Sequence, residues 1–389
     1  MVRNSYISCA GWCLVAFLAH PAHAFCQIGE RNLAHKVHTS LFSSFDAKDL
    51  LYQDQQLAME KRALYEETLL KKAKELKSPL LKPKQAKSGT GFGGGASKVD
   101  PKVQLAVEQA KILRRDGVIR IDNALSKELA DDFRKQILEQ KNDAASMIEA
   151  NFVPSEALYG VENQRASRCD LQLSLLRAEN DDQRHVLADT LQELLGNCGT
   201  LRHVYEELVT LDGEFYELAA VITDPGSSRQ KIHPDLPFKK DAPLYVVFLA
   251  LQDVNEAMGP TSFLLKTHTD KENRKFHNPS IEVRDKQLSS ADHRISTLKK
   301  GDAVVFDARV LHCGNANESE NGSTRVLFNF SFRNPKVQGD LGYKGSIRPY
   351  YERKMKLKDV SDALIEYEND ATIDPFLKYG NGIDVPSNK

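Results

Sequence analysis

The chain has 389 residues, enough for one large domain with attached segments or for two or three average domains. Its 53 Lys and Arg balance 54 Asp and Glu, and the formal charge of -1 disfavours binding to nucleic acid or an anionic membrane through bulk charge. Hydrophobic residues make up 41% and charged residues 28%, as in globular proteins and unlike disordered ones. The 6 cysteines include no CxxC pair, which predicts neither a disulfide framework nor a thiolate zinc site.

The N-terminus has the pattern of a secretory signal peptide. Arg3 precedes a short apolar stretch, and the small residues Ala22 and Ala24 end it at the positions that a signal peptidase recognises. A short buried helix is the alternative. We expect removal of residues 1–24, which leaves a chain without a stable membrane span and directs it to the secretory pathway. The junction before Phe25 also resembles that of two-part algal plastid presequences, so the final location is a plastid or outside the cell.

Residues 25–100 are predicted to be a presequence or linker. From Asp46 to Lys77 the sequence is rich in Glu, Lys, Leu and Ala and lacks Gly and Pro, which predicts a long, mostly solvated helix. Leucines recur there at heptad spacing, but too few heptads are present to support the alternative of a coiled coil. The Lys-rich and Gly-rich stretches that follow, up to Gly95, predict a linker, because ordering so many glycines costs too much backbone entropy.

We place the folded domain at residues 101–340 and a C-terminal extension at 341–389. The domain begins with the pattern of a helix, a strand and a helix, at Pro101–Leu113, Val118–Ile121 and Ser126–Leu138. Residues 168–175 alternate like a strand, and helical periodicity returns at 181–195 and 201–208. Strands then predominate, at 215–223, 244–251, 261–266, 303–307 and 324–333. This order predicts a mainly β, α+β fold with a jelly roll or barrel and not a doubly wound sheet.

His233 and Asp235 are the first residues that indicate chemistry. Two positions apart on an extended segment, their side chains lie on one face with Cα atoms about 6.5 to 7 Å apart, so both can reach one ion. Pro234 between them suits a loop or the end of an edge strand. Taken alone, such a pair is more often a surface turn.

His312 is the second such residue. The turn at Gly301-Asp302 and the β-branched run after it predict a buried strand pair that ends at this histidine. A lone histidine after an apolar run is more often part of the packing. The neighbouring Cys313 would point to the opposite face of a strand, and we expect it to pack there.

Arg325 lies across a turn from His312, at the start of a segment with one apolar and one polar face. The apolar face is made by Phe residues and Val326. If that face packs outward, Arg325 and Asn329 point into an interior cavity, where a buried arginine needs a carboxylate partner. If the Phe residues are on the core side, the polar face is instead solvated.

Together His233, Asp235 and His312 offer two imidazoles and one carboxylate. This donor set suits non-haem Fe(II), because three protein ligands leave room for a bidentate 2-oxo acid and O2. A structural zinc site would need four protein ligands, and no fourth residue has matching spacing. Arg325 is placed to hold an anionic ligand.

The sequence resembles the phytanoyl-CoA dioxygenase family of Fe(II)- and 2-oxoglutarate-dependent oxygenases from about Gly117 to Pro335. Six ordered matches support the resemblance: Gly117 to Ser126, His233-x-Asp235, Val247 to Val254 with Met258 to Ser262, Lys266-Thr267-His268, Gly301-Asp302, and His312 to Asn315 with Arg325.

The resemblance implies a double-stranded β-helix, a cupin-like jelly roll, with flanking helices. It implies iron bound by His233, Asp235 and His312, and Arg325 bound to the distal carboxylate of 2-oxoglutarate. Such an enzyme hydroxylates a small-molecule or lipid-like substrate with O2 and releases succinate and CO2. The presence of Asp235 disfavours the halogenase variant of this chemistry.

Three features depart from the family pattern or repeat it. Leu327 stands where many such enzymes have Ser or Thr, which would remove one hydrogen bond to the cosubstrate. Gly314 occupies a position that is often small and polar. A second His-x-Asp, at His268 and Asp270, is assigned to a loop and not to iron.

Two other functions use the same residues: a non-catalytic binding or scaffold protein on this fold, and a metal-dependent hydrolase or isomerase that needs no arginine for an anion. The substrate and the oligomeric state do not follow from the sequence. Residues 140–165 and 270–295 are predicted to be loops that shape the approach of the substrate, and the tail after Pro335 a short helical cap.

Overall fold

The computed structural model describes residues 47–78, 100–153, 155, 158–159, 167–176, 185–343, 345–347 and 354–379. These residues belong to two compact units that divide between Lys71 and Lys72. The predicted signal peptide and the Gly-rich segment lie outside the described residues. None of the described helices is long and apolar enough to cross a bilayer.

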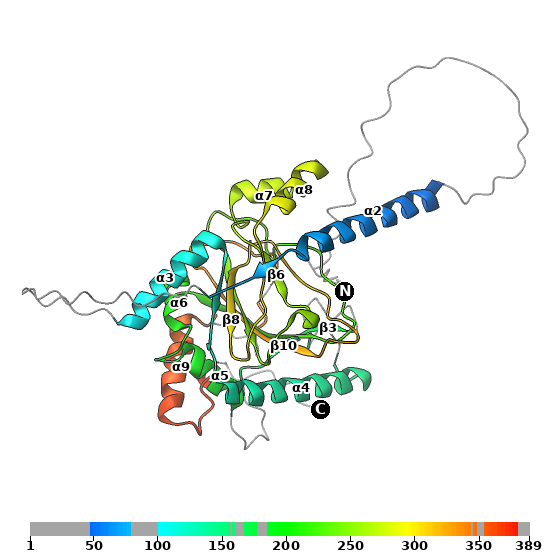
Figure 1. Ribbon diagram of the computed structural model, residues 1–389. Coiled ribbons are helices and arrows are strands. Elements are labelled where there is room, and N and C mark those ends of the chain that lie inside the picture. Colours follow the sequence, from blue (N-terminus) through cyan, green and yellow to red (C-terminus); the bar gives the residue numbers. More distant parts are fainter. Residues whose placement is uncertain are drawn as a thin grey trace, which may run out of the picture. The chain divides into compact units, whose positions relative to one another are not determined.

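The first unit has one described helix, α2, Ala47–Leu70 (blue in Figure 1). The sequence predicts this helix as far as Lys77, which is wrong at its C-terminal end. Lys74 and Glu75 instead form strand β1 of the second unit, which pairs in parallel with β7, His293–Ile295. Pairing between distant parts of the chain outweighs helix propensity here.

A six-stranded antiparallel sheet forms the larger layer of the second unit, with the strand order β2-β8-β5-β10-β4-β3. All six strands lie close to their predicted positions, because each has a β-branched or alternating run bounded by turn residues. Their bounds are Val118–Ile121 (β2), Arg168–Gln172 (β3), Glu214–Thr223 (β4), Leu244–Ala250 (β5), Ala303–Asp307 (β8) and Arg325–Arg333 (β10).

The smaller sheet has the order β1-β7-β6-β9, with β6 at Thr261–Leu264 and β9 at His312–Gly314. Phe263 of β6 packs against Phe306 of β8, with ring centroids 5.2 Å apart, so the two sheets enclose a shared core. This is the predicted jelly roll, or double-stranded β-helix, with flanking helices. The chain crosses from the large sheet to the small one between Asp307 and His312, whereas the sequence predicted a single strand pair.

Strand β10 has two buried faces. Val326 and the Phe side chains at 328, 330 and 332 pack outward against helices, as shown by Phe133 of α4 against Phe328 at 4.9 Å. Arg325, at 1% exposed, and Asn329, at 8%, therefore face the barrel interior. This outcome confirms the interior alternative and excludes a solvated polar face.

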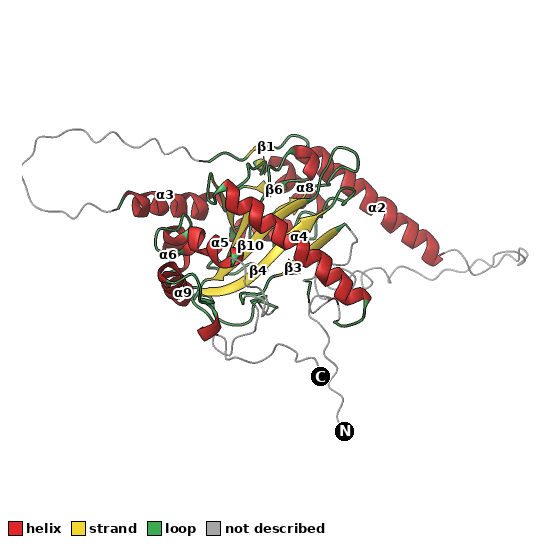
Figure 2. Ribbon diagram, turned by 90° about the horizontal axis from the view of Figure 1, so that it is seen from below, coloured by secondary structure: helices red, strands yellow, loops and turns green. Residues whose placement is uncertain are grey.

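Five helices cover the outer face of the large sheet (Figure 2). α3 begins at a proline behind an Asp100 cap and ends at Gly117, whose φ of 85° is the left-handed conformation that glycine adopts easily. The bounds are Pro101–Asp116 (α3), Lys127–Glu149 (α4), Val186–Leu195 (α5), Arg202–Val209 (α6) and Leu357–Asn369 (α9).

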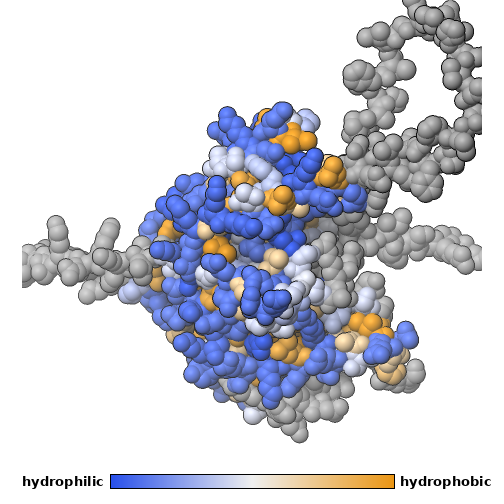
Figure 3. All heavy atoms as spheres, turned by 45° about the vertical axis from the view of Figure 1, so that its right-hand side comes forward, coloured by the Kyte–Doolittle hydropathy of each residue, from blue (hydrophilic) through white to orange (hydrophobic). Residues whose placement is uncertain are grey.

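Two segments predicted to be loops contain helices. α4 extends to Glu149, and the connection between β6 and β7 folds as α7, Asp270–Phe276, and α8, Ile281–Ser290. Thr269 and Ser280 cap the latter two helices by accepting hydrogen bonds from backbone N–H groups. Two short 3-10 turns complete the described elements, Glu256–Met258 and Leu377–Tyr379. On the face shown in Figure 3, hydrophilic side chains predominate and apolar ones are scattered.

Candidate metal centre and its surroundings

His233 and His312 are brought together by backbone hydrogen bonding. Each donates its N–H to the carbonyl oxygen of the other at 2.9 Å, which forms an isolated antiparallel bridge. Asp235 is fixed in turn by its N–H, which donates to the carbonyl of Ala308 at 2.9 Å. The three side chains offer ligand atoms that all lie within 4.8 Å of one another. The structure therefore assembles the three predicted residues at one point.

The hydrogen bonds of the two imidazoles orient the rings toward that point. Nδ1 of His233 lies 2.7 Å from the carbonyl oxygen of Lys231, and Nδ1 of His312 lies 3.0 Å from that of Val310. A carbonyl oxygen only accepts, so in the neutral rings each Nδ1 has the proton and each Nε2 has the lone pair with which a metal could bind. Both Nε2 atoms face Oδ1 of Asp235, at 3.8 Å and 3.3 Å.

The electrostatics of the triad favour its charged forms. Burial alone would raise the pKa of Asp235, but the two histidines, His312 above all, hold it below the usual range. Burial alone would lower the pKa of His312, but the Asp235 carboxylate raises it. A cation at this point would take over the charge that His312 provides to the carboxylate.

The chemistry of the donor set fits iron. Two nitrogens and one carboxylate converge, His312 is 5% exposed, and the side chains of His233 and Asp235 are 38% and 32% exposed. One side of the triad thus stays open for further ligands, as an oxygen-activating ferrous site requires.

Arg325 is a buried cation without a protein anion. Its two terminal nitrogens donate to the carbonyl of Gly259 and, at 3.1 Å, to the hydroxyl of Thr223, while its Nε has no partner. No Asp or Glu among the described residues pairs with it. Burial lowers its pKa to about 9, and the charge of Arg168 adds to this effect. A ligand carboxylate beside Arg325 would offset both the desolvation of its guanidinium and the repulsion by Arg168.

Arg168 is a second buried guanidinium at the same end of the barrel, and the sequence reasoning missed its role. It lies opposite Thr223, which lies opposite Arg325 on the other side. Its nitrogens donate to the Ser227 hydroxyl and to backbone carbonyls. Its alternation with Cys169 was a usable signal, since the period of two puts it on the inner face.

Gly314 has a steric reason to be glycine. A Cβ atom there would collide with a terminal nitrogen of Arg168 and come within 2.8 Å of Oε1 of Gln230. The backbone N–H of Gly314 also donates to that same oxygen at 2.8 Å. A larger residue would therefore displace the guanidinium.

The remaining predicted positions take other roles. Nε2 of His268 lies 3.1 Å from the carbonyl oxygen of Arg114, and Asp270 begins α7, so this His-x-Asp pair is not part of the triad. Leu327 is 3% exposed and packs with the inner apolar cluster. Cys313 is fully buried, as expected.

The opposite end of the barrel is acidic. Glu217 of β4 faces Ser331 across the strand pair, and its carboxylate accepts hydrogen bonds from that hydroxyl at 2.6 Å and from the Tyr343 hydroxyl at 2.9 Å. Burial raises the pKa of Glu217, the two hydroxyls lower it, and the nearby charge of Asp235 raises it further. This residue was not predicted as functional.

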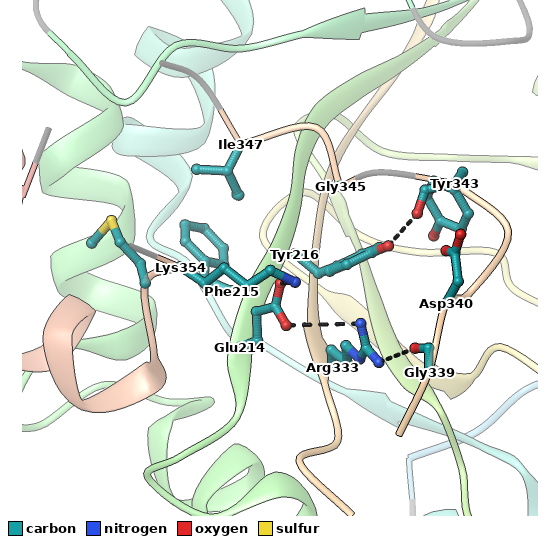
Figure 4. Close-up of a pocket in the computed structure, with 11 residues that line it drawn as sticks. Glu214, Phe215, Tyr216, Arg333, Gly339, Asp340, Tyr343, Gly345, Ile347 and Lys354 are labelled. Atoms are coloured by element: carbon teal, nitrogen blue, oxygen red, sulfur yellow. Dashed lines mark hydrogen bonds and ion pairs between the residues drawn. The ribbon is translucent and has the colours of Figure 1, made fainter. Parts of the chain in front are cut away.

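A cavity of about 410 Å³ lies beyond that acidic end (Figure 4). Tyr343 lines it, and the Tyr216 hydroxyl donates to the Tyr343 carbonyl on its wall. The ion pair between Arg333 and Glu214 is also on its wall. None of the described residues that line it belongs to the triad, so the cavity is distinct from the metal centre.

The jelly roll and the triad fit a non-haem iron enzyme, and the sequence comparison identifies an iron- and 2-oxoglutarate-dependent oxygenase-type enzyme. The sequence profile of the family Phytanoyl-CoA dioxygenase (PhyH) matches residues 113–326, more than half of the chain. The chain belongs to this family. Its cofactor is iron, and its cosubstrates are 2-oxoglutarate and O2.

Solved structures with similar folds are distant in sequence. One is SnoN, a non-heme alpha ketoglutarate dependent epimerase from nogalamycin biosynthesis, with 16% identity, a TM-score of 0.39 and coverage of 65% of this chain and 99% of that one. Another is SnoK, a carbocyclase from the same biosynthesis, with 15% identity, a TM-score of 0.43 and coverage of 62% and 87%. AviO1 from Streptomyces viridochromogenes Tue57 has 15% identity, a TM-score of 0.38 and coverage of 63% and 99%. No curated protein matches the sequence.

Proposed function

We propose that the protein hydroxylates a small-molecule or lipid-like substrate, with iron bound by His233, Asp235 and His312. The convergence of these three ligand atoms within 4.8 Å is the observation that supports the proposal most directly. We propose that Arg325 binds the distal carboxylate of 2-oxoglutarate, because it is a fully buried guanidinium whose Nε has no partner.

When bound, iron with 2-oxoglutarate and O2 would supply the oxidising power, with succinate and CO2 as the products of the cosubstrate. The residues of the chain orient and enclose this chemistry. The carbonyls of Lys231 and Val310 accept hydrogen bonds from the Nδ1–H groups, which leaves the Nε2 atoms of both rings to bind the metal if it is present. Phe263 stacks on His312 at 5.7 Å between ring centroids, Phe306 packs against it at a tilt at 5.1 Å, and both shield that ligand from water.

The direct test is succinate formation from 2-oxoglutarate with Fe(II) and O2, together with the thermal midpoint. We expect Fe(II) and 2-oxoglutarate to raise the midpoint of the wild-type protein, because a ligand that binds only the folded state stabilises it. His233→Ala and Asp235→Asn should abolish succinate formation. Loss of a metal ligand should reduce activity more than loss of a residue that hydrogen-bonds to a ligand, which alone reduces metal affinity or activity about 10- to 100-fold.

The chain offers a matched control in its second His-x-Asp pair. Asp270→Asn makes the same chemical change at the N-terminus of α7, and we expect it to leave succinate formation intact. If Fe(II) and 2-oxoglutarate leave the midpoint unchanged, the protein is a binding or scaffold protein on this fold. Turnover that survives Arg325→Ala would instead favour a hydrolase or isomerase.

We further propose the boundaries 101–340 for the oxygenase domain and 341–389 for the extension, and cleavage after Ala24 on the secretory route. N-terminal sequencing of the mature protein from its source checks the cleavage, with Phe25 as the expected first residue. A mature chain that still begins at Met1 would contradict it.

A further inference from the structure

The barrel interior is ordered from a basic end to an acidic end. Across β3, β4 and β10, one row contains Arg168, Thr223 and Arg325, and a later row pairs Glu217 with Ser331. All these side chains lie on the inner face of the sheet, because alternate residues of a strand point to the same face. On their inner faces, these strands therefore hold guanidinium groups at one end and the Glu217 carboxylate toward the other, while Arg333 beyond it pairs with Glu214.

Backbone hydrogen bonds place the triad along this direction. Near the basic end, the N–H of Gln230 donates to the carbonyl of Gly314, the residue that lies against Arg168. Toward the acidic end, the N–H of Asp235 donates to the carbonyl of Ala308. The N–H of Ala308 donates to Leu244, which pairs with Arg333, two residues beyond Ser331. Asp235 thus lies on the side of Glu217, and a ligand at Arg325 approaches the triad from the other side.

Glu217 has hydrogen-bonding capacity left over. It accepts two hydrogen bonds from neutral hydroxyls, and no Lys, Arg or His among the described residues forms an ion pair with it. An ionised carboxylate has about four acceptor positions, so about two remain. The side chain is half-buried, which strengthens its attraction for a cation that reaches it.

Asn329 provides an independent sign of a ligand. It lies on the inner face of β10 between Arg325 and Ser331, it is 8% exposed, and its Oδ1 has no hydrogen-bond partner. Across Ala219, the Oε1 of Gln172 is also buried without a partner. Both residues lie on rows between the Arg168–Thr223–Arg325 row and the Glu217–Ser331 pair, and the inward Oδ1 of Asn329 can accept a hydrogen bond from a ligand there.

We propose that the substrate presents a protonated amine to this acidic end, bound by the Glu217 carboxylate, with Asn329 accepting a hydrogen bond. The inference rests on the proposed oxygenase function and specifies its substrate class. An ammonium group has only donors, so it matches a carboxylate and an amide oxygen, while a substrate carboxylate would be repelled by Glu217 and Asp235. The substrate amine would then be bound at the acidic end, while 2-oxoglutarate would be bound at the basic end.

The test uses the full chain with Fe(II) and 2-oxoglutarate under anaerobic conditions and three probes of matched length: hexylamine, hexanol and hexanoate. Titration calorimetry measures their affinities. We expect hexylamine to bind about tenfold more tightly than hexanol and hexanoate to bind most weakly, since a charge-assisted hydrogen bond exceeds a neutral one by this order. Glu217→Gln should remove the preference for the amine.

Two control variants separate charge from structure. Tyr343→Phe removes a hydroxyl that donates to Glu217 but keeps its charge, and Asp340→Asn removes another carboxylate at the same cavity. Both should keep the preference for the amine. If Tyr343→Phe loses it as Glu217→Gln does, Glu217 only positions Tyr343 and the inference is wrong.

The outcomes also separate the inference from the proposed function. If Fe(II) and 2-oxoglutarate shift the thermal midpoint but hexylamine binds no better than hexanol, the inference fails and the oxygenase function stands. If neither Fe(II) nor 2-oxoglutarate shifts the midpoint, the proposed function fails. Should Glu217→Gln not fold, Asn329→Leu tests the same preference, and an unchanged ratio of amine to alcohol affinity would overturn the inference.

Discussion

The two ends of the barrel interior differ in how their charges are compensated. At the basic end, Arg325 is 1% exposed and meets only neutral acceptors, so its positive charge is unbalanced. At the acidic end, Glu217 is half-buried and meets only neutral donors. Proteins seldom keep buried charges unpaired, because the desolvation penalty is several kcal/mol for each ion. The two ligands that we propose, 2-oxoglutarate at one end and an amine at the other, would each supply the missing opposite charge.

The largest effect is expected from removing the basic end. Arg325→Leu should weaken 2-oxoglutarate binding about a hundredfold, because truncating one member of a buried charge pair costs about 2 to 5 kcal/mol. The Kd for 2-oxoglutarate, measured by titration calorimetry with Fe(II) under anaerobic conditions, checks this. The affinity for Fe(II) alone should stay the same.

Arg333→Leu is the matched control at the other end of the same strand. Arg333 pairs with Glu214 at 4.0 Å and lies on the wall of the cavity, away from the triad. Its loss should leave the Kd for 2-oxoglutarate unchanged. An equal loss of affinity for 2-oxoglutarate in Arg325→Leu and Arg333→Leu would show that the two ends of the barrel do not bind different ligands.

A smaller effect is expected from Gly314→Ala. The added methyl group would displace the guanidinium of Arg168, which is 4% exposed and has little room to move. We expect 2-oxoglutarate to bind about tenfold more weakly, by about 1.4 kcal/mol, because a charge at that end is misplaced. Fe(II) binding, measured separately, should be retained. An unchanged Kd for 2-oxoglutarate would exclude Arg168 from the basic end.

The smallest effect concerns the stability of the protein without ligands. Burial raises the folded-state pKa of Glu217 above its unfolded value of about 4.3. Below that pH the carboxyl is protonated in both states, so burying it costs no stability through its charge. As the pH rises from there through the folded-state pKa, the cost of ionising the buried carboxyl lowers the free energy of unfolding, and this loss persists at neutral pH. Glu217→Gln should therefore raise the thermal midpoint at neutral pH by about 2 to 4 °C, an effect on the order of 1 kcal/mol, and leave it unchanged near pH 4.

Glu214→Gln is the control for that measurement. Glu214 pairs with Lys354 at 2.7 Å, so neutralising it should lower the midpoint or leave it unchanged. A higher thermal midpoint in both Glu217→Gln and Glu214→Gln would mean that general charge repulsion, and not the burial of Glu217, limits stability.

The sequence predicted most of the large sheet and the members of the triad, because both have local signals. Strand alternation fixes which side chains face inward, and the short distance from His233 to Asp235 fixes one pair. The face of β10 was ambiguous in the sequence, since Phe side chains suit either side. Only the helices that pack on Phe328 and its neighbours decide it.

The missed features depend on contacts between distant segments. β7 and β9 have three residues each, too few to show a period, and they become strands by pairing with distant segments: β7 with β1 and β6, and β9 with β6. Helices α7 and α8 are polar and short, so their signal was that of a charged loop. Glu217 looked like an ordinary residue of a strand, because its position relative to Asp235 exists only in the folded chain.

Strand β1 has a practical consequence for any shortened form of the protein. Its residues precede the Gly-rich segment, yet Leu76 is 6% exposed and its N–H donates to Ile295 of β7. A version that starts at Pro101 would uncover the backbone of β7, whose free N–H and C=O groups could recruit a strand from another molecule. Self-association of such a truncated form would therefore reflect a lost neighbour and not an intrinsic dimer.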